Sequence, residues 1–337
     1  MSLQRLKLPV LACVLGMASA VHHVQGAEAQ EDKRDVQNLL QKIRSAAQKL
    51  NYSGTFVYQQ ASQIRTSRIS HLVDASGEVE KLEILDGKPR EYIRHNDEVA
   101  CYLPDTKTVQ MEKNVTQEVF PAMLANNAAS LPDTYAIHRS DMGRVAGMPC
   151  QIVNFEPRDA FRYGYRLCMD NASGLLLRAQ TVNNKNEIIE QIAFTQIAIG
   201  DIDKNLVKSS FPNTSQWQTE NLTVQSNVNS GWVVKSLPVG FKKTREMKRL
   251  IPMSPATAAN SAETKAHQVI QMIFSDGLAA ISVFIEPGSQ GRTEGSLQQG
   301  AMTIMVKRQG DYWLTVVGEV PFTAIKQVMN SIEYKSK

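Results

Sequence analysis

Residues 52–103 read YSGTFVYQQASQIRTSRISHLVDASGEVEKLEILDGKPREYIRHNDEVACYL, and the pattern of this stretch decides the fold class. Strand-like runs at 55–60, 65–73, 79–85, 91–95 and 99–103 alternate with turn signals such as Asp74–Gly77, Asp86-Gly87 and Asn96-Asp97. The signals recur about every ten residues, which is typical of short strands joined by tight turns. The stretch therefore predicts an antiparallel meander.

The flanking segments extend this sheet and add one helix. Before it, apolar residues recur at helical spacing behind Asp35 and predict a helix over 36–50. After it, a strand at 108–112 and a break at 120–131 lead to further strands at 135–139, 150–155, 163–169, 175–182 and 188–199. The helices are too few for βαβ units, so the first domain is expected to be a large curved antiparallel sheet.

A polar segment at 206–224 interrupts the strand rhythm and is expected to be a linker. It separates a first domain at 27–205 from a smaller one at 225–337. The second domain has strand-like runs and a closing helix that Pro321 opens, which indicates an α+β unit. Two long stretches, 252–264 and 287–300, are expected to be loops, either functional or without structure.

The first 26 residues have the three parts of a secretory signal peptide. Arg5 and Lys7 supply positive charge, 8–17 form an apolar stretch, and Ala18-Ser19-Ala20 is a small-residue cleavage site. Cleavage after Gly26 is the alternative. The apolar stretch is about half of the ~20 residues that a membrane span needs. The pattern predicts an exported protein from which the leader is removed.

Cys101, Cys150 and Cys168 remain once the leader has taken Cys13, and disulfides persist in an oxidising compartment. Segment 150–170 predicts a hairpin that turns at Asp159. If Glu156 faces Arg162, the same register sets Cys150 opposite Cys168. We expect a Cys150–Cys168 disulfide with Cys101 free, while a bridge that uses Cys101 stays open.

The sequence contains no recognisable catalytic, phosphate-loop or metal-binding motif. The histidines beyond the leader are scattered, and the acidic residues are dispersed through turns. The formal net charge of +4, from 37 Lys and Arg against 33 Asp and Glu, is too mild to indicate nucleic-acid binding. We expect neither catalysis, nor a metal, nor a cofactor, nor a nucleic-acid partner.

Two basic clusters are candidate contact sites. One falls within a single predicted strand, where alternation would place three residues on one face as partner-binding candidates: Lys243, Arg245 and Arg249. The other flanks the hairpin turn: Arg158, Arg162 and Arg166. Either cluster could bind an acidic peptide or a lipid phosphate. Edge strands whose charges block aggregation are the alternative.

Several short strings resemble the MucB/RseB family of envelope-stress regulators. In the first domain they are Tyr52–Tyr58, Leu85–Gly87 with Arg90-Glu91, Glu98–Pro104, and Pro157–Asp159 with Arg162–Leu167. In the second they are Leu237–Phe241, Phe274–Leu278 and Val316–Pro321. The strings run in order through both domains, which makes the set more specific than any one string.

The resemblance implies a fold and a function. The first domain would be similar to lipoprotein carriers, a half-barrel that cups an apolar cavity around helical elements. The protein would act in the periplasm, where it binds the periplasmic segment of a single-span anti-sigma factor (RseA/MucA type) and shields it from site-1 proteolysis. Lipopolysaccharide or the acyl chains of a mislocalised lipoprotein would release it. A monomer and a homodimer stay open.

The cavity expectation combines this resemblance with the alternation of apolar residues in strands that must curve. The candidates for its lining are Phe56, Tyr58, Ile69, Leu82, Ile84, Val99 and Ile152. Two competing interpretations are a periplasmic lipid or lipoprotein carrier and a secreted hydrolase with an unrecognised site. The second domain argues against a simple carrier, which would not need it.

Overall fold

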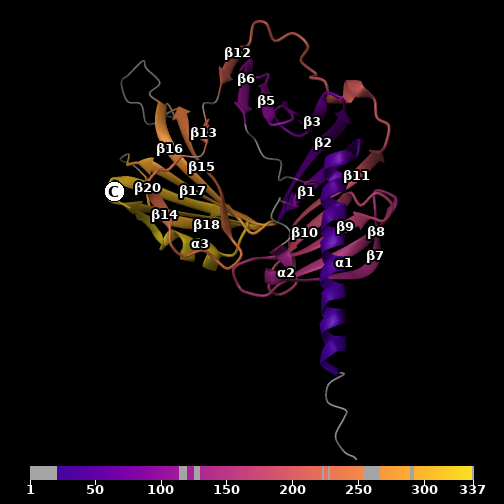
Figure 1. Cartoon of the computed structure of the whole chain (residues 1–337). Helices are drawn as coiled ribbons and strands as arrows, with labels where there is room; N and C mark the ends of the chain where they lie inside the picture. Colours follow the sequence, from indigo (N-terminus) through magenta and orange to yellow (C-terminus); the bar gives the residue numbers. More distant parts are fainter. Residues whose placement is uncertain are drawn as a thin grey trace, which may run out of the picture.

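A computed structural model describes residues 21–113, 120–124, 130–221, 224–226, 228–252, 266–288 and 292–335. Most of the expected leader and almost all of the expected loop at 252–264 lie outside these residues. The described chain forms two sheet domains that lie side by side (Figure 1).

The first domain is a helix followed by an antiparallel meander, as the turn spacing predicts. The helix α1 covers Val21–Lys49 and includes the expected segment. The elements after it are β1 (Tyr52–Gln60), β2 (Gln63–Asp74), β3 (Gly77–Ile84), β4 (Arg90–His95), β5 (Glu98–Leu103), β6 (Thr108–Lys113), α2 (Leu131–Thr134), β7 (Tyr135–Val145), β8 (Met148–Pro157), β9 (Gly164–Asp170), β10 (Leu176–Val182) and β11 (Ile188–Ile199). The first and last strands pair, so two meanders join along β1 and β11.

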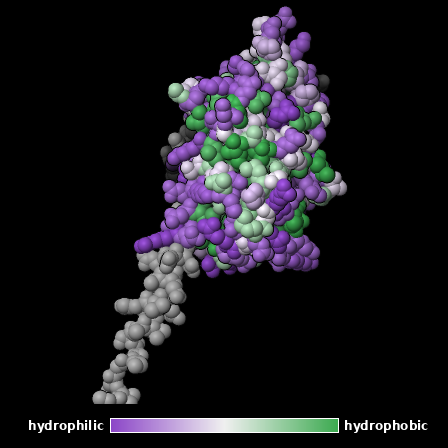
Figure 2. Space-filling model, turned by 90° about the vertical axis from the view of Figure 1, so that its right-hand side faces the viewer, coloured by the Kyte–Doolittle hydropathy of each residue, from purple (hydrophilic) through white to green (hydrophobic). Residues whose placement is uncertain are grey.

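One face of this sheet carries the core, and we call it the inner face. It includes Phe56 and Ile69, which are buried together with Leu40 and Ile43 of α1. The apolar stripe of the helix therefore covers the sheet face that the period-two pattern makes apolar. From the side that faces away from the second domain, apolar residues form patches among hydrophilic ones (Figure 2).

The expected linker is not a free tether. Its first residues belong to the 3-10 helix η2 (Lys204–Val207), and β12 (Gln218–Asn221) pairs in parallel with β6 as a twelfth strand of the first sheet. Between them, the amide of Ser210 donates to the buried carboxylate of Glu91 at 2.9 Å. β13 (Val224–Ser226) then pairs with the second sheet. The linker is thus anchored to both sheets.

The second domain is α+β, as expected. Its elements are β14 (Trp232–Val234), β15 (Lys242–Pro252), β16 (Ala266–Ser275), β17 (Ala280–Pro287), β18 (Gly295–Gln299), β19 (Met302–Gln309), β20 (Tyr312–Gly318), α3 (Phe322–Met329) and β21 (Ile332–Tyr334). Ile325 and Val328 of α3 pack into the core formed by Ile281 and Val316. β18 lies inside the stretch expected to be a loop. All five of its residues are exposed, so no apolar alternation marks it in the sequence.

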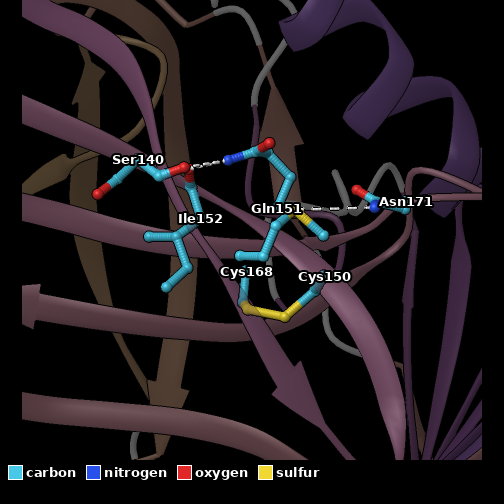
Figure 3. The surroundings of a disulfide bond; sticks show 7 residues. Ser140, Cys150, Gln151, Ile152, Cys168 and Asn171 are labelled. Atoms are coloured by element: carbon cyan, nitrogen blue, oxygen red, sulfur yellow. Dashed lines mark hydrogen bonds between the residues drawn. A yellow bond between two sulfur atoms is a disulfide. The ribbon is translucent and has the colours of Figure 1, made fainter.

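The Cys150–Cys168 disulfide is present and Cys101 is free, as expected, but the register behind the prediction is wrong (Figure 3). Cys150 lies opposite Asp170, and Ile152 lies opposite Cys168, so the bridge joins diagonal neighbours with Cα atoms 5.5 Å apart. Arg162 lies outside the strand ladder. The connection between β8 and β9 therefore contains more residues than a hairpin that turns at Asp159 would leave unpaired.

Candidate functional site

The predicted cavity residues mostly share one face. The strand register places Ile69 opposite Leu82, and alternation along the strands puts Phe56, Tyr58, Ile84 and Val99 on the same inner face. At Phe56 this face is filled, because the ring packs edge-on against Phe120 at 5.6 Å and Phe194 at 5.9 Å between centroids.

Ile152 does not lie with the other six. Cross-strand pairs connect Tyr58 of β1 to β8. Tyr58 opposes Ile192, and the pairing continues through Ala179 and Leu167 to Val153. Val153, and not Ile152, is therefore the residue of β8 that shares the inner face with Tyr58. Since successive residues of a strand point to opposite faces, Ile152 lies on the outer face, beside the disulfide.

The predicted common face of Lys243, Arg245 and Arg249 is wrong. A bulge between Lys243 and Arg245 shifts the pairing of β15 with β16, so Lys243 opposes Phe274 while Arg245 opposes Ile273. An extra residue in one strand reverses the alternation beyond it. Lys243 consequently pairs with Glu246, at 2.6 Å between Nζ and Oε2, on the face opposite to Arg245 and Arg249.

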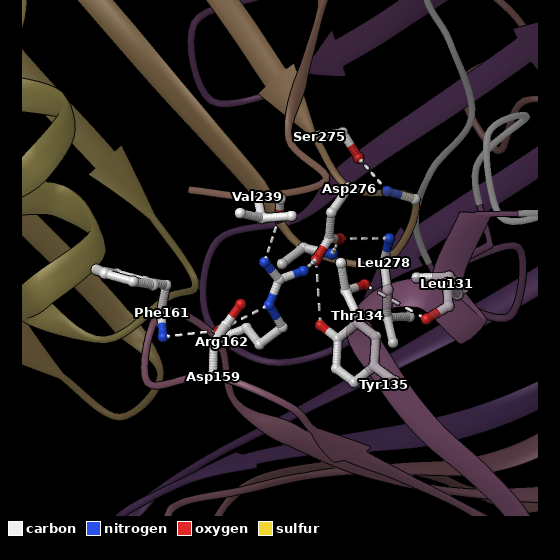
Figure 4. Close-up of polar contacts among 12 residues, drawn as sticks. Leu131, Thr134, Tyr135, Asp159, Phe161, Arg162, Val239, Ser275, Asp276 and Leu278 are labelled. Atoms are coloured by element: carbon white, nitrogen blue, oxygen red, sulfur yellow. Dashed lines mark hydrogen bonds and ion pairs between the residues drawn. The ribbon is translucent and has the colours of Figure 1, made fainter. Parts of the chain in front are cut away.

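The junction between the domains holds a buried ion pair (Figure 4). Arg162, from the connection between β8 and β9, donates from Nη1 to Oδ2 of Asp276, which follows β16, at 2.6 Å. Both side chains are 0% exposed. A buried charge needs a partner for each of its polar atoms, because it has lost its hydration.

Acceptors surround the guanidinium of Arg162. Its Nε donates to Oδ1 of Asp159 at 3.0 Å, and its Nη2 donates to the carbonyl of Val239. Its central carbon lies 5.5 Å from the ring centroid of Tyr135 and 5.3 Å from that of Phe241. Arg162 therefore joins two segments of the second domain to the first.

The carboxylate of Asp276 is equally well satisfied. Its Oδ1 accepts from the amides of Leu278 at 3.0 Å and Ala279 at 2.8 Å, and its Oδ2 also accepts from the hydroxyl of Tyr135 at 3.3 Å. Burial raises the pKa of this carboxyl, while the two amides and Arg162 act in the opposite direction. Burial likewise raises the pKa of the Tyr135 hydroxyl.

Apolar side chains cross the junction in both directions. Leu278 of the second domain packs against the core of the first, and Phe161 of the first packs against the core of the second. Gly240 has a φ of +86°, and a Cβ there would lie 2.8 Å from Cγ2 of Thr134. The close approach and the backbone conformation both favour glycine at this position.

A second set of polar contacts lies nearer the surface of the junction. Arg249 of β15 pairs with Glu112 of β6, at 2.8 Å between Nη2 and Oε1. Gln60 of β1 donates to the carbonyl of Gln299 in β18 at 3.0 Å. Gln298 donates to the hydroxyl of Tyr163 at 2.9 Å. These contacts extend the junction along both sheets.

Two hollows lie along the junction. One of about 250 Å³ is lined by Met123 of the first domain and by residues of the second that include Leu278, Met302 and Val317. The other, about 680 Å³, is a groove between Ile188 and Gln191 of β11 and Gln298 and Gly300 of the second domain. Both are apolar in part, so an extended or acyl ligand would find contacts from both domains.

Among the described residues, no group of three or more His, Cys, Asp and Glu side chains is placed to hold a metal ion. Within the same part of the chain, no helix has both the length and the apolar character of a membrane span. The junction residues were partly visible in the sequence, because Arg162 and Asp276 belong to strings that carry the family resemblance.

Two family models match this chain, one after the other. Residues 35–221 match the MucB/RseB N-terminal domain, and residues 226–333 match the MucB/RseB C-terminal domain. The sigma factor AlgU regulatory protein MucB of Pseudomonas aeruginosa is 28% identical over 96% of each chain. The sigma-E factor regulatory protein RseB of Escherichia coli is 23% identical over 88% of this chain and 90% of its own.

Solved structures of MucB match the fold of both domains. MucB in complex with MucA(peri) has a TM-score of 0.67 at 27% identity and covers 89% of this chain and 99% of its own. The Pseudomonas aeruginosa MucA/MucB complex gives 0.68 at 27% identity over 90% of this chain. Because two family domains match in order across most of its length, the chain belongs to the MucB/RseB family.

Proposed function

We propose that this protein is a periplasmic negative regulator of an envelope-stress sigma factor, which acts by binding the periplasmic segment of a membrane-bound anti-sigma factor. The observation that carries the proposal is the match of both domains to MucB, a regulatory protein solved in complex with the periplasmic part of MucA. A binding role agrees with a domain junction that is formed by apolar packing and ion pairs.

The junction supports the proposal because it presents surfaces from both domains to one ligand. The larger groove has lining residues on each side of the boundary, and Ile188 beside it is 48% exposed. An extended segment that entered this groove would contact both domains. Its affinity would therefore depend on how the two domains are oriented. Shielding such a segment from a protease needs no further activity.

The experiment is a titration of the whole protein with the periplasmic segment of the anti-sigma factor from the same organism. A scrambled segment of identical composition is the control. Saturable binding of the native segment alone supports the proposal, and equal binding of both segments, or of neither, contradicts it.

The basic residues of β15 provide a sharper version of this test. Lys243 and Arg245 lie on opposite faces, so Lys243→Glu and Arg245→Glu separate the two surfaces. A partner that docks by charge on one face associates more slowly with only one variant. Unchanged association of both variants at low salt would remove β15 from the partner site.

We also propose that lipid releases the protein from the anti-sigma segment. Apolar lining at the junction supports it, because each buried acyl CH₂ contributes about 0.8 kcal/mol. Lipopolysaccharide or a diacyl lipopeptide added to the complex should displace the segment, since a ligand that prefers the unbound conformation shifts the equilibrium. A complex that persists at saturating lipid would contradict release and leave partner binding intact.

A further inference from the structure

The outer face of the first sheet carries a guanidinium without an acceptor. Arg178 of β10 lies opposite Cys168 of β9 and is half-buried. Its Nε is buried and has no hydrogen-bond partner among the described residues, and within that part of the chain Arg178 forms no ion pair. A buried donor without an acceptor costs free energy, so it indicates a position that a ligand would satisfy.

A second cation lies beside it. Arg166 of β9 opposes Gln180, two residues along β10 from Arg178 and on the same face. Side chains in diagonal positions of neighbouring strands are within reach of one another. Burial, and then the charge of Arg166, lower the pKa of Arg178. Two positive charges therefore lie together on this face.

The surrounding residues leave these charges uncompensated. Arg166 donates from Nη2 to the side-chain oxygen and the carbonyl of Asn186, which are neutral acceptors. Glu156 of β8 pairs with His138 at 3.6 Å, and Glu187 accepts from Asn183 at 2.8 Å.

The same face also offers an acceptor. Asn154 of β8 lies opposite Arg166, and its buried Oδ1 has no donor among the described residues. A hydroxyl or amide on a ligand would fit this atom.

We propose that Arg166 and Arg178 form a binding site for a phosphate group on the outer face of the first sheet. A phosphate monoester carries about −1.5 to −2 charge and three acceptor oxygens, which suits two guanidiniums better than one carboxylate does. Arg162, the neighbour of Arg166 in the basic cluster of the sequence, points into the junction and takes no part. The site is independent of the proposed partner binding.

The test follows the Nε–H resonances of arginine in ¹H–¹⁵N spectra of the whole protein as inorganic phosphate is added. Chloride at matched ionic strength is the control. The resonance that is absent from Arg178→Gln should shift saturably with phosphate alone. Affinity measured by calorimetry should fall by about tenfold or more in Arg178→Gln, because a hydrogen bond to a charged group is lost.

Arg166→Gln is the second variant and should weaken phosphate binding in the same direction. Arg144→Gln, an exposed arginine of the same domain whose Nε donates to the carbonyl of Gly147, is the matched control and should bind as the wild type does. Glucosamine 1-phosphate distinguishes the source of the phosphate. Tighter binding than inorganic phosphate assigns the site to a phosphorylated sugar head group, and equal binding assigns it to free phosphate.

Three results would overturn the proposal. The first is no saturable shift with either phosphate compound. The second is equal shifts with chloride and phosphate. The third is unchanged affinity in both Arg178→Gln and Arg166→Gln.

Discussion

Two ion pairs cross the same junction and differ in burial. The side chains of Arg162 and Asp276 are 0% exposed and every charged group has several partners, whereas Arg249 and Glu112 are 28% and 19% exposed. The contrast shows where the orientation of the domains is determined. A buried pair with matched donors and acceptors admits one geometry, while a pair that water reaches tolerates others.

The largest expected effect follows from breaking the buried pair on one side. Asp276→Ala leaves the Arg162 guanidinium buried without its principal counter-charge and should destabilise the protein by roughly 3–5 kcal/mol. Denaturant unfolding measures the change. The double variant Arg162→Met with Asp276→Leu should recover part of the loss, because no unpaired charge stays buried, while the amides of Leu278 and Ala279 still lack their acceptor.

A single variant as stable as the wild type would mean that water enters the junction and solvates Arg162. That outcome would make the two ion pairs equivalent and remove the contrast between them.

A third charge cluster, inside the first sheet, provides a reference that crosses no domain boundary. Burial alone would raise the pKa of Glu78, but hydrogen bonds from His71 and Arg94 outweigh it and hold the pKa at about 2. The carboxyl titrates near 4.5 in the unfolded chain, so its stabilisation is complete above that pH and is lost as the pH falls towards 2.

The stability difference between wild type and Glu78→Gln should therefore be largest near neutral pH and shrink below pH ~4.5. Melting temperatures measured from pH 7 down to pH 3 test this. A difference that stays constant over that range would show that Glu78 acts through packing rather than through its charge.

The smallest effect is expected at the outer pair. Glu112→Gln removes the partner of Arg249 and should cost about 1 kcal/mol or less, and the loss should diminish as salt is added. The same unfolding experiment at low and high ionic strength measures it. A loss as large as that of Asp276→Ala would place the decisive contact at the surface of the junction instead.

Local patterns in the sequence predicted much of the fold. The turn signals between residues 52 and 103 predicted the meander, and the change of period predicted the helix that precedes it. The predicted Cys150–Cys168 disulfide was correct, although the predicted strand register was off by two residues. A shift of two residues leaves both cysteines on the same face of the sheet, where they can still bridge diagonally. The family was predicted from the resemblance of short strings in both domains to MucB/RseB proteins.

Features that depend on tertiary context were missed. The bulge beside Lys243 moves that side chain to the other face, and nothing in a run of basic residues indicates it. The contact between Arg162 and Asp276 joins residues 114 positions apart, so only the folded chain brings them together. The exposed strand β18 carries no apolar alternation and was expected to be a loop.

In the proposed function, the two domains, held by the junction, form one binding body for the anti-sigma segment. Calorimetric titration of that segment into the wild type and into Asp276→Ala, at a temperature where both are folded, tests it most directly. We expect saturable binding to the wild type and affinity lower by about tenfold in the variant, because fewer molecules hold the competent orientation. No binding to the wild type, or equal affinity for both proteins, would contradict it.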